Sequence, residues 1–185
     1  MSQTPRVANM GAGFHGLRAA QALKNAPVEV LMLDRYNYHT FQPLLYQVAA
    51  AELDPEQIAH SVRGIYHEQK NFYFRLANVV GVEWDKQEVL IEEGEPIHFD
   101  YLILAAGAST NYFGIPGVQE NAFPLKRITH AVNLRSHIMR QFERTDANRL
   151  LIEEGVLTFV VVGGGPTGVE MAGALVELFD KVLFK

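Results

Sequence analysis

The stretch Val162-Gly163-Gly164-Gly165-Pro166-Thr167-Gly168-Val169-Glu170 decides how this chain folds. It follows an apolar run at residues 157–162 and precedes a helical pattern at residues 171–178. A strand, a glycine turn and a helix, in that order, are the setting of a dinucleotide-binding fingerprint. The glycines allow a tight turn and a close approach to a pyrophosphate, and the helix N-terminus offers free N–H groups to negative charge. The stretch therefore predicts a nucleotide site.

A second turn of this kind, Gly11-Ala12-Gly13-Phe14-His15-Gly16, stands near the N-terminus, about 150 residues earlier. It lies between a short strand at residues 5–10 and a helical pattern at residues 14–24. The next apolar strand, residues 28–33, ends in Asp34, about 20 residues after the glycines, where a ribose-binding carboxylate belongs. We predict that Asp34 accepts hydrogen bonds from an adenosine ribose. The alternative is a turn that serves only helix–strand packing, with Asp34 as a solvated strand end.

Asn9 interrupts the first strand with a polar side chain. A buried amide must find a hydrogen bond or destabilise the protein by roughly 1–3 kcal/mol. Asn9 is therefore expected to have a specific partner.

The rest of the chain predicts a fold with two nucleotide-binding domains. Residues 71–105 read as short strands, the last of which, residues 100–105, has the apolar composition of a buried strand returning to the first sheet. An amphipathic helix is expected at residues 128–144, and another helix begins near Asp54 and runs to about Tyr66. We predict an α/β protein with a Rossmann-like domain at residues 1–112 that contains an inserted β-meander, a linker and helix at 113–156, and the start of a second Rossmann-like domain at 157–185.

Composition excludes several classes of function. The chain has 185 residues, is 48% hydrophobic and carries a formal net charge of -5, so it lacks the basic surface that nucleic-acid binding needs. It has no cysteine, which excludes disulfides, thiolate metal sites and cysteine nucleophiles. His130 and His137 lack a third ligand at metal-binding spacing, so no metal site is predicted. The sequence contains no run of about 18 apolar residues, so we predict no membrane span.

Four stretches together resemble the type II NADH dehydrogenases, which are single-subunit, non-proton-pumping flavoenzymes. They are Gly11-Ala12-Gly13-Phe14-x-Gly16, Asp34-Arg35-x-Asn37-Tyr38-His39, Phe41-Gln42-Pro43-Leu44-Leu45-Tyr46-Gln47-Val48-Ala49, and Phe159-Val160-Val161-Val162 with the glycine turn that follows. Many flavoproteins share the glycine turns, but the second and third stretches are more particular. The resemblance covers residues 6–178. It departs from the family pattern at Asn9, His15 and Ala106.

The resemblance implies that the first turn binds FAD, through Gly11, Ala12, Gly13, Phe14, His15 and Gly16. Asp34 and Arg35 would lie at the adenosine ribose. Val79 would contact the adenine through its backbone, and Gly107 would lie close to the cofactor. Gln47 would lie near the flavin ring, although the residues alone favour an apolar loop and the start of a helix around it.

The resemblance also implies that the second turn binds NADH, through Gly163, Gly165, Pro166, Thr167 and Gly168. Glu170 matches the family's acidic residue near the nicotinamide–flavin contact and would act electrostatically as hydride moves to the flavin. The alternative for Glu170 is an anion favoured by a helix N-terminus.

The activity implied is transfer of hydride from NADH to FAD and of electrons on to quinone. Because the chain stops before the second strand of the NADH domain, we expect it to be the N-terminal part of such an enzyme. The family would place it in the cytoplasm or, as the full-length form, on the cytoplasmic face of the inner membrane. There it would be a peripheral protein that contacts the membrane through a missing C-terminal region. A homodimer would be compatible with the resemblance.

Two other functions stay open. A ferredoxin-reductase-like or rubredoxin-reductase-like flavoprotein shares the two-nucleotide architecture and needs no cysteine. A non-catalytic nucleotide-binding remnant would also account for the early end of the second domain. A disulfide reductase is excluded in its usual form, because that chemistry needs a redox cysteine pair.

Overall fold

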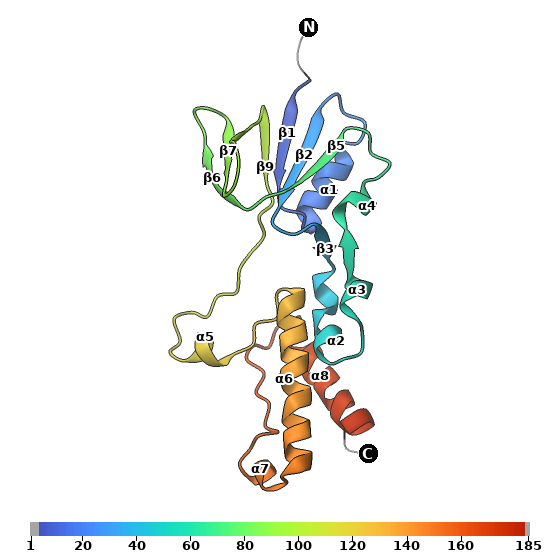
Figure 1. Ribbon diagram of the computed structural model, residues 1–185, viewed down its shortest axis with the longest axis vertical. Helices are drawn as coiled ribbons and strands as arrows, with labels where there is room; N and C mark the ends of the chain where they lie inside the picture. Colours follow the sequence, from blue (N-terminus) through green and yellow to red (C-terminus); the bar gives the residue numbers. More distant parts are fainter. Residues whose placement is uncertain (1–3, 184–185) are drawn as a thin grey trace. The chain divides into compact units, whose positions relative to one another are not determined.

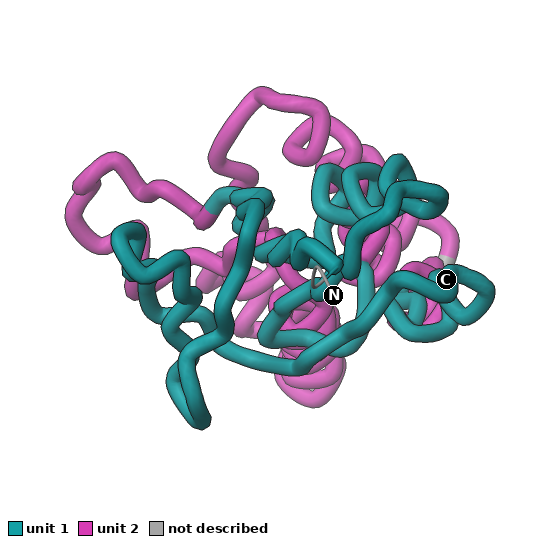
Figure 2. Tube along the Cα trace, turned by 90° about the horizontal axis from the view of Figure 1, so that it is seen from above, with its two compact units in different colours: residues 1–39, 59–108 teal, residues 40–58, 109–185 magenta. Residues whose placement is uncertain are grey.

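The computed structural model describes residues 4–183 and divides into two compact units, which Figure 2 colours separately. Unit 1 consists of Met1–His39 and Ala59–Ala108, and unit 2 consists of Thr40–Ile58 and Ser109–Lys185. The segment Thr40–Ile58 thus packs within unit 2, although it lies between the two sequence segments of unit 1.

Unit 1 is built on a four-stranded parallel sheet (Figure 1). The strand order is β5 (Phe72–Leu76), β2 (Glu29–Asp34), β1 (Arg6–Met10) and β9 (Tyr101–Leu104). The chain therefore adds β2 and β5 on one side of β1 and returns with β9 on the other side. This order confirms the predicted α/β class and the return of the strand near residue 100 to the first sheet.

The two faces of this sheet are covered by different elements. Successive side chains of a strand point to opposite faces, so Val30 and Met32 of β2 face one side and Leu33 faces the other. The first side packs against α1 (Phe14–Ala22) and α4 (Val62–Ile65). The second side packs against an antiparallel meander of β6 (Val79–Glu83), β7 (Glu88–Ile91) and β8 (Ile97–His98). The predicted β-meander is therefore confirmed.

Unit 2 is helical, with a core between α2 (Leu45–Ala49), α6 (Ile128–Ala147) and α8 (Pro166–Leu178). The buried residues of this core are Leu45, Val48, Ala49, Ile58, Ala131, Ile138, Met171, Leu175 and Leu178. The aromatic-rich stretch around Gln47 thus supplies a core helix, as its residues alone suggest. The remaining elements of the chain are short: β3 (Tyr38–Thr40), η1 (Gln42–Leu44), α3 (Pro55–Ile58), β4 (Ala59–Ser61), α5 (Val118–Asn121), α7 (Leu150–Glu153) and η2 (Phe179–Leu183).

The helix predicted from Asp54 to Tyr66 is wrong, because an extended segment interrupts it. Strand β4 lies between α3 and α4 and pairs with β3. The N–H of Phe41 donates to the carbonyl of Ile58 at 2.8 Å, and the N–H of Val62 donates to the carbonyl of Asn37 at 3.0 Å. These bonds hold residues 59–61, the middle of the expected helix, in a strand that pairs with β3.

The strand predicted at residues 157–162 is also wrong. The structure shows no strand there, and Val160 and Val162 are 81% and 74% exposed. A strand exists only when its backbone bonds to a neighbouring strand. Within residues 4–183 no strand pairs with this run, so its apolar side chains remain at the surface.

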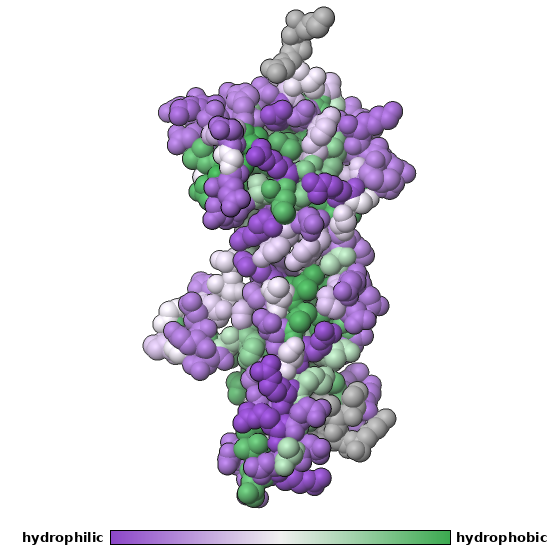
Figure 3. Space-filling view, in the orientation of Figure 1, coloured by the Kyte–Doolittle hydropathy of each residue, from purple (hydrophilic) through white to green (hydrophobic). Residues whose placement is uncertain are grey.

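Other apolar side chains also remain at the surface of unit 1. In the edge strand β9, Tyr101 is 62% and Leu104 is 61% exposed. Figure 3 shows apolar surface among hydrophilic side chains. No helix in the described part of the chain combines the length and apolar character needed to cross a membrane.

The helical core of unit 2 leads to a prediction about stability. Ile138 of α6 is fully buried, whereas Ile152 of α7 is 48% exposed. Ile138→Ala should lower the free energy of unfolding by about 2–5 kcal/mol, because it leaves a cavity in the core. Ile152→Ala is the matched control and should change it by less than about 1 kcal/mol. Denaturant titrations of both variants would measure this, and equal effects would contradict the described core.

Candidate nucleotide-binding site

Three parallel strands of unit 1 end at the same edge of the sheet. Met10 is paired with Leu33 on one side and with Leu104 on the other. The next residues, Gly11 and Asp34, therefore leave the sheet side by side. The strand order reverses between β1 and β9, and ligands of such sheets bind in the crevice at the carboxyl ends where the order reverses.

The first glycine turn is closed by two contacts that only glycine permits. Gly11 has φ of 112°, and a Cβ there would overlap the carbonyl of Ala105. A Cβ on Gly16 would overlap the carbonyl of Gly11. A Cβ on Gly13 would instead meet no atom within 4 Å. The first and last glycines thus hold strand and helix together, while the middle one borders open space at the N-terminus of α1.

Asp34 is joined to this turn by hydrogen bonds. Its Oδ2 accepts from the N–H of Ala12 at 2.7 Å, and its Oδ1 accepts from the N–H of Tyr36 at 2.8 Å. Each carboxylate oxygen can accept more than one hydrogen bond, so both keep capacity for a ligand. Asp34 is only half-buried. The arrangement places a carboxylate beside the glycine turn, as ribose binding requires.

His39 is a further partner of the turn that residue spacing does not reveal. Its Nδ1–H donates to the carbonyl of Ala12 at 2.8 Å, and its side chain is buried. The ring of Phe14 meets it edge to face, with centroids 4.9 Å apart. The only sequence signal for His39 is its place in the Asp34–His39 stretch that carries the family resemblance. We therefore add His39 to the residues that shape this site.

Four other predicted residues of the first site also belong to unit 1. His15 and Arg35 are exposed, and the guanidinium of Arg35 lies 5.9 Å from the ring centre of Tyr36. Val79 begins β6 and is half-buried. Gly107 follows β9, is exposed, and has φ of 77° with open space where a Cβ would stand. The direct contacts of these residues with a cofactor remain predictions.

The second glycine turn has the same internal geometry as the first. Gly163 has φ of 117°, and a Cβ on Gly168 would overlap the carbonyl of Gly163. The N-cap residue of α8, Gly165, has φ of -76° and ψ of 174°, against -75° and -177° for Gly13 at the N-cap of α1. The second turn therefore adopts the backbone conformation of the first, although within residues 4–183 no strand pairs with the run before it.

Helix α8 begins at Pro166, and Thr167 follows. Proline is favoured at the first position of a helix, because the N–H that it lacks would have no partner within the helix there. Glu170 is the fifth residue of this helix and is exposed. The electrostatic effect of a helix N-terminus falls off within its first turn. The alternative explanation of Glu170 as a helix-terminus anion is therefore weakened.

Gln47 lies in α2 of unit 2 and is half-buried. Its backbone carbonyl accepts from the N–H of Glu52 at 2.8 Å and from that of Leu53 at 3.3 Å. These bonds end the helix, and the expected position of Gln47 near a flavin remains a prediction.

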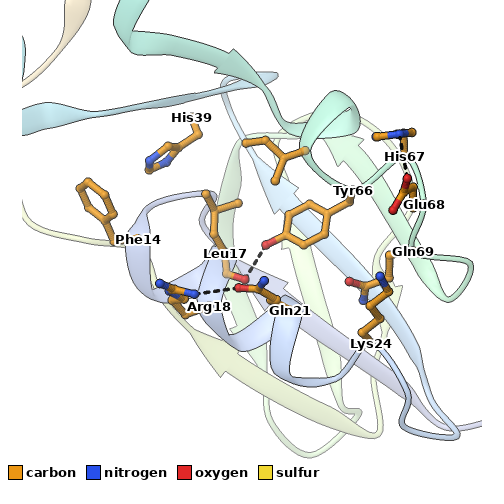
Figure 4. Close-up of a pocket in the computed structure, with 11 residues that line it drawn as sticks. Phe14, Leu17, Arg18, Gln21, Lys24, His39, Tyr66, His67, Glu68 and Gln69 are labelled. Carbon is orange, nitrogen blue, oxygen red and sulfur yellow. Dashed lines mark hydrogen bonds and ion pairs between the residues drawn. The ribbon is translucent and has the colours of Figure 1, made fainter.

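A cavity of about 350 Å³ lies between α1 and residues 65–69, and Phe14 and His39 line it as well (Figure 4). The hydroxyl of Tyr66 donates to the carbonyl of Leu17, and Nε2 of Gln69 donates to that of Ala20 at 3.0 Å. Burial raises the pKa of Tyr66 above its ordinary value, while the charge of Arg18 acts in the opposite direction. Tyr66 is thus a neutral donor at neutral pH. Because these polar groups of the cavity already have partners in the protein, we do not place the nucleotide there.

These features define the class of the protein. A parallel sheet with a crossover, a glycine turn that borders open space and a carboxylate at the next strand end fit the diphosphate and ribose of a dinucleotide. Unit 1 is therefore a dinucleotide-binding fold of the Rossmann type.

Comparisons with known proteins agree with this assignment of a dinucleotide-binding fold. Residues 5–184 match the family described as pyridine nucleotide-disulphide oxidoreductase. The chain belongs to this family of oxidoreductases. The disulfide chemistry in the family's description is not available to these 185 residues, since they include no cysteine.

Individual relatives confirm the resemblance to one group within this family, the type II NADH dehydrogenases. The chain is 42% identical over 182 residues to the type II NADH:quinone oxidoreductase NdhA of Mycobacterium tuberculosis, covering 96% of this chain and 39% of NdhA. It is 32% identical to the external alternative NAD(P)H-ubiquinone oxidoreductase B3 of Arabidopsis thaliana, covering 97% of this chain and 33% of that protein. The chain therefore spans about two fifths or less of the length of these curated relatives.

A solved structure supports the same assignment. NDH2 of Plasmodium falciparum in complex with NADH aligns with a TM-score of 0.86 and 26% identity, covering 97% of this chain and 38% of NDH2. NADH:rubredoxin oxidoreductase of Clostridium acetobutylicum aligns with a TM-score of 0.73 at 20% identity, covering 95% of this chain and 43% of that protein. The second match shows only a shared fold.

The glycine geometry predicts different effects for two similar variants. Gly16→Ala should destabilise the protein by more than about 2 kcal/mol, because the new methyl group overlaps the Gly11 carbonyl. Gly13→Ala should leave stability within about 1 kcal/mol, because its methyl group enters open space, yet it should weaken nucleotide binding. Thermal unfolding and a FAD titration of both variants would test this. A Gly13→Ala variant that binds FAD like the wild type would contradict the proposed use of that space.

Proposed function

We propose that this chain is the FAD-binding portion, with the beginning of the NADH-binding portion, of an NADH:quinone oxidoreductase of type II. One observation carries the proposal: Asp34 and the Gly11–Gly16 turn are joined by hydrogen bonds at the edge where the strand order of unit 1 reverses. The similarity to type II enzymes at 42% identity supports NADH and quinone as the substrates.

Residues of unit 1 would bind and orient FAD. The N–H groups at the start of α1 would face its diphosphate, and Asp34 would accept hydrogen bonds from its ribose hydroxyls. Arg35 would flank the ribose, the backbone at Val79 would contact the adenine, and Gly107 would allow a close approach of the cofactor. When bound, FAD supplies the capacity to take up a hydride and pass on two electrons.

Residues of unit 2 would bind NADH and act electrostatically on its nicotinamide ring. The turn from Gly163 to Gly168 would receive the diphosphate, a role that its close glycine contact, like that of the first turn, supports. Pro166 and Thr167 begin the helix whose N–H groups would face it. Glu170 would act on the positive charge that develops on a nicotinamide as hydride leaves. Its carboxylate has no hydrogen-bonding or ionic partner within residues 4–183 and is free for this role.

The longer protein would complete the assembly. Because the chain spans about two fifths of its relatives, we infer that further sequence supplies the rest of the NADH domain and the quinone site. Within this scheme residues 1–112 form the FAD domain, 113–156 a linker and helix, and 157–185 the start of the NADH domain. Peripheral contact with the cytoplasmic face of a membrane and a homodimeric state are proposed for the longer protein from the family resemblance.

The proposed role of Asp34 can be tested against Asp100, a carboxylate at the opposite end of the same sheet, directly before β9. Asp34→Ala should weaken FAD binding by roughly 1–3 kcal/mol, because ribose hydroxyls lose a charged acceptor. Asp100 is the control: its Oδ2 accepts from the N–H of Arg6 at 2.6 Å, at the start of β1. Asp100→Ala should leave FAD affinity unchanged. Calorimetric titration with FAD would measure both, and an equal affinity of wild type and Asp34→Ala would contradict the assignment.

The role of Glu170 can be tested in the full-length enzyme by stopped-flow reduction with NADH. Glu170→Gln should slow flavin reduction roughly tenfold, less than the loss of a buried oxyanion donor, because the side chain is exposed. Glu177→Gln on the same helix is the control, since Glu177 is ion-paired with Lys181 at 3.0 Å. An unchanged reduction rate in Glu170→Gln would contradict an electrostatic role of Glu170 in flavin reduction.

A further inference from the structure

Asn9 is a fully buried polar residue in β1, two positions before the first glycine turn. Its Nδ2 donates to the carbonyl of Gly16 at 2.7 Å. Gly16 is the third residue of α1, so this bond joins the end of β1 directly to the first turn of the helix. Asn9 therefore has the specific partner that its position demands.

The other half of the Asn9 amide is not satisfied. Its Oδ1 is buried and has no hydrogen-bond partner among the described residues. Rotating the amide by 180° would place Oδ1 against the Gly16 carbonyl, so the observed orientation is the favourable one. A buried acceptor without a partner is destabilising. Stability of the fold alone thus gives little reason for an asparagine here.

The second glycine turn shows that the amide is not needed to form the turn. Val161 stands two residues before Gly163, as Asn9 stands two residues before Gly11. Cγ1 of Val161 lies 3.5 Å from the place of a Cβ on Gly168, and Oδ1 of Asn9 lies 3.2 Å from the place of a Cβ on Gly16. An apolar side chain therefore occupies the same position in a turn of the same geometry.

We propose that Asn9 is a positioning residue for the nucleotide: its amide holds the Gly16 carbonyl and so fixes the start of α1 against β1. The N–H groups at the start of α1 are those that would face the diphosphate, and a binding group that is already held in place loses less entropy when the ligand binds. The inference rests on the proposed binding of FAD at this turn. It concerns Asn9, which acts through Gly16 and does not itself contact the ligand.

The test uses Asn9→Leu, an apolar side chain of similar size, and Asn9→Val, which copies the second turn. Both variants remove the donor to Gly16 and also the unsatisfied acceptor. Thermal stability without ligand should therefore stay equal or rise. FAD affinity should fall about tenfold, and amide hydrogen exchange at residues 13–17 should speed up about tenfold, each reflecting one lost hydrogen bond. Exchange at residues 165–169 of the second turn should not change.

Asn71→Leu is the control for general destabilisation. The amide of Asn71 donates to the carbonyls of Leu23, at the C-terminus of α1, and of Val28, directly before β2, both at 3.0 Å. This variant should lower thermal stability without a selective effect on exchange at residues 13–17.

Two results would overturn the role of Asn9. One is an Asn9→Leu variant with wild-type FAD affinity and wild-type exchange at the turn. The other is a variant in which exchange rises evenly throughout unit 1 and stability falls, as a merely structural role requires. If the wild-type chain does not bind FAD, the proposed function fails for this chain. The exchange comparison then still decides whether Asn9 holds the turn, since it is measured without ligand.

Discussion

The site depends on one close contact, made twice in this chain. In each turn the last glycine lies so close to the carbonyl of the first glycine that a Cβ cannot stand between them. In the first turn, this contact brings the helix N-terminus against the end of β1. The parallel sheet then places Asp34 beside the turn, because Met10 and Leu33 are paired in register. Backbone N–H groups and a carboxylate therefore converge without any side chain reaching far.

Much of this arrangement is predictable from sequence because it follows from local rules. Glycine spacing, apolar strands and the position of Asp34 predict the first turn, its helix and the return of the strand near residue 100 to the first sheet. The same rules fail at residues 157–162, where an apolar run finds no strand to pair with among residues 4–183. Its turn still forms, which shows that the glycine contact needs no completed sheet. Helix propensity fails similarly at residues 59–61, where hydrogen bonds to a distant segment produce a strand.

The partners of the turn were harder to predict. His39 reaches the carbonyl of Ala12 from a segment 27 residues further along the chain, and no spacing rule connects the two. The sequence marks Asn9 as a polar residue in an apolar strand, but only the structure identifies its partner, the carbonyl of Gly16. The apolar neighbours of Gln47 favour its position within a helical core, whereas its expected place near a flavin depends on family resemblance alone. Function is therefore best supported where local geometry and similarity agree, at the first turn.

The most direct test of this account is to map FAD binding on the isotopically labelled chain by nuclear magnetic resonance. The account predicts that shifts of backbone amides in unit 1 upon addition of FAD centre on residues 11–16, on Asp34 and on residues 105–107. Shifts centred on the cavity beside α1, around Arg18 and Lys24, would place the ligand elsewhere. Either that result or an absence of shifts at the glycine turn would contradict the assignment of the first site.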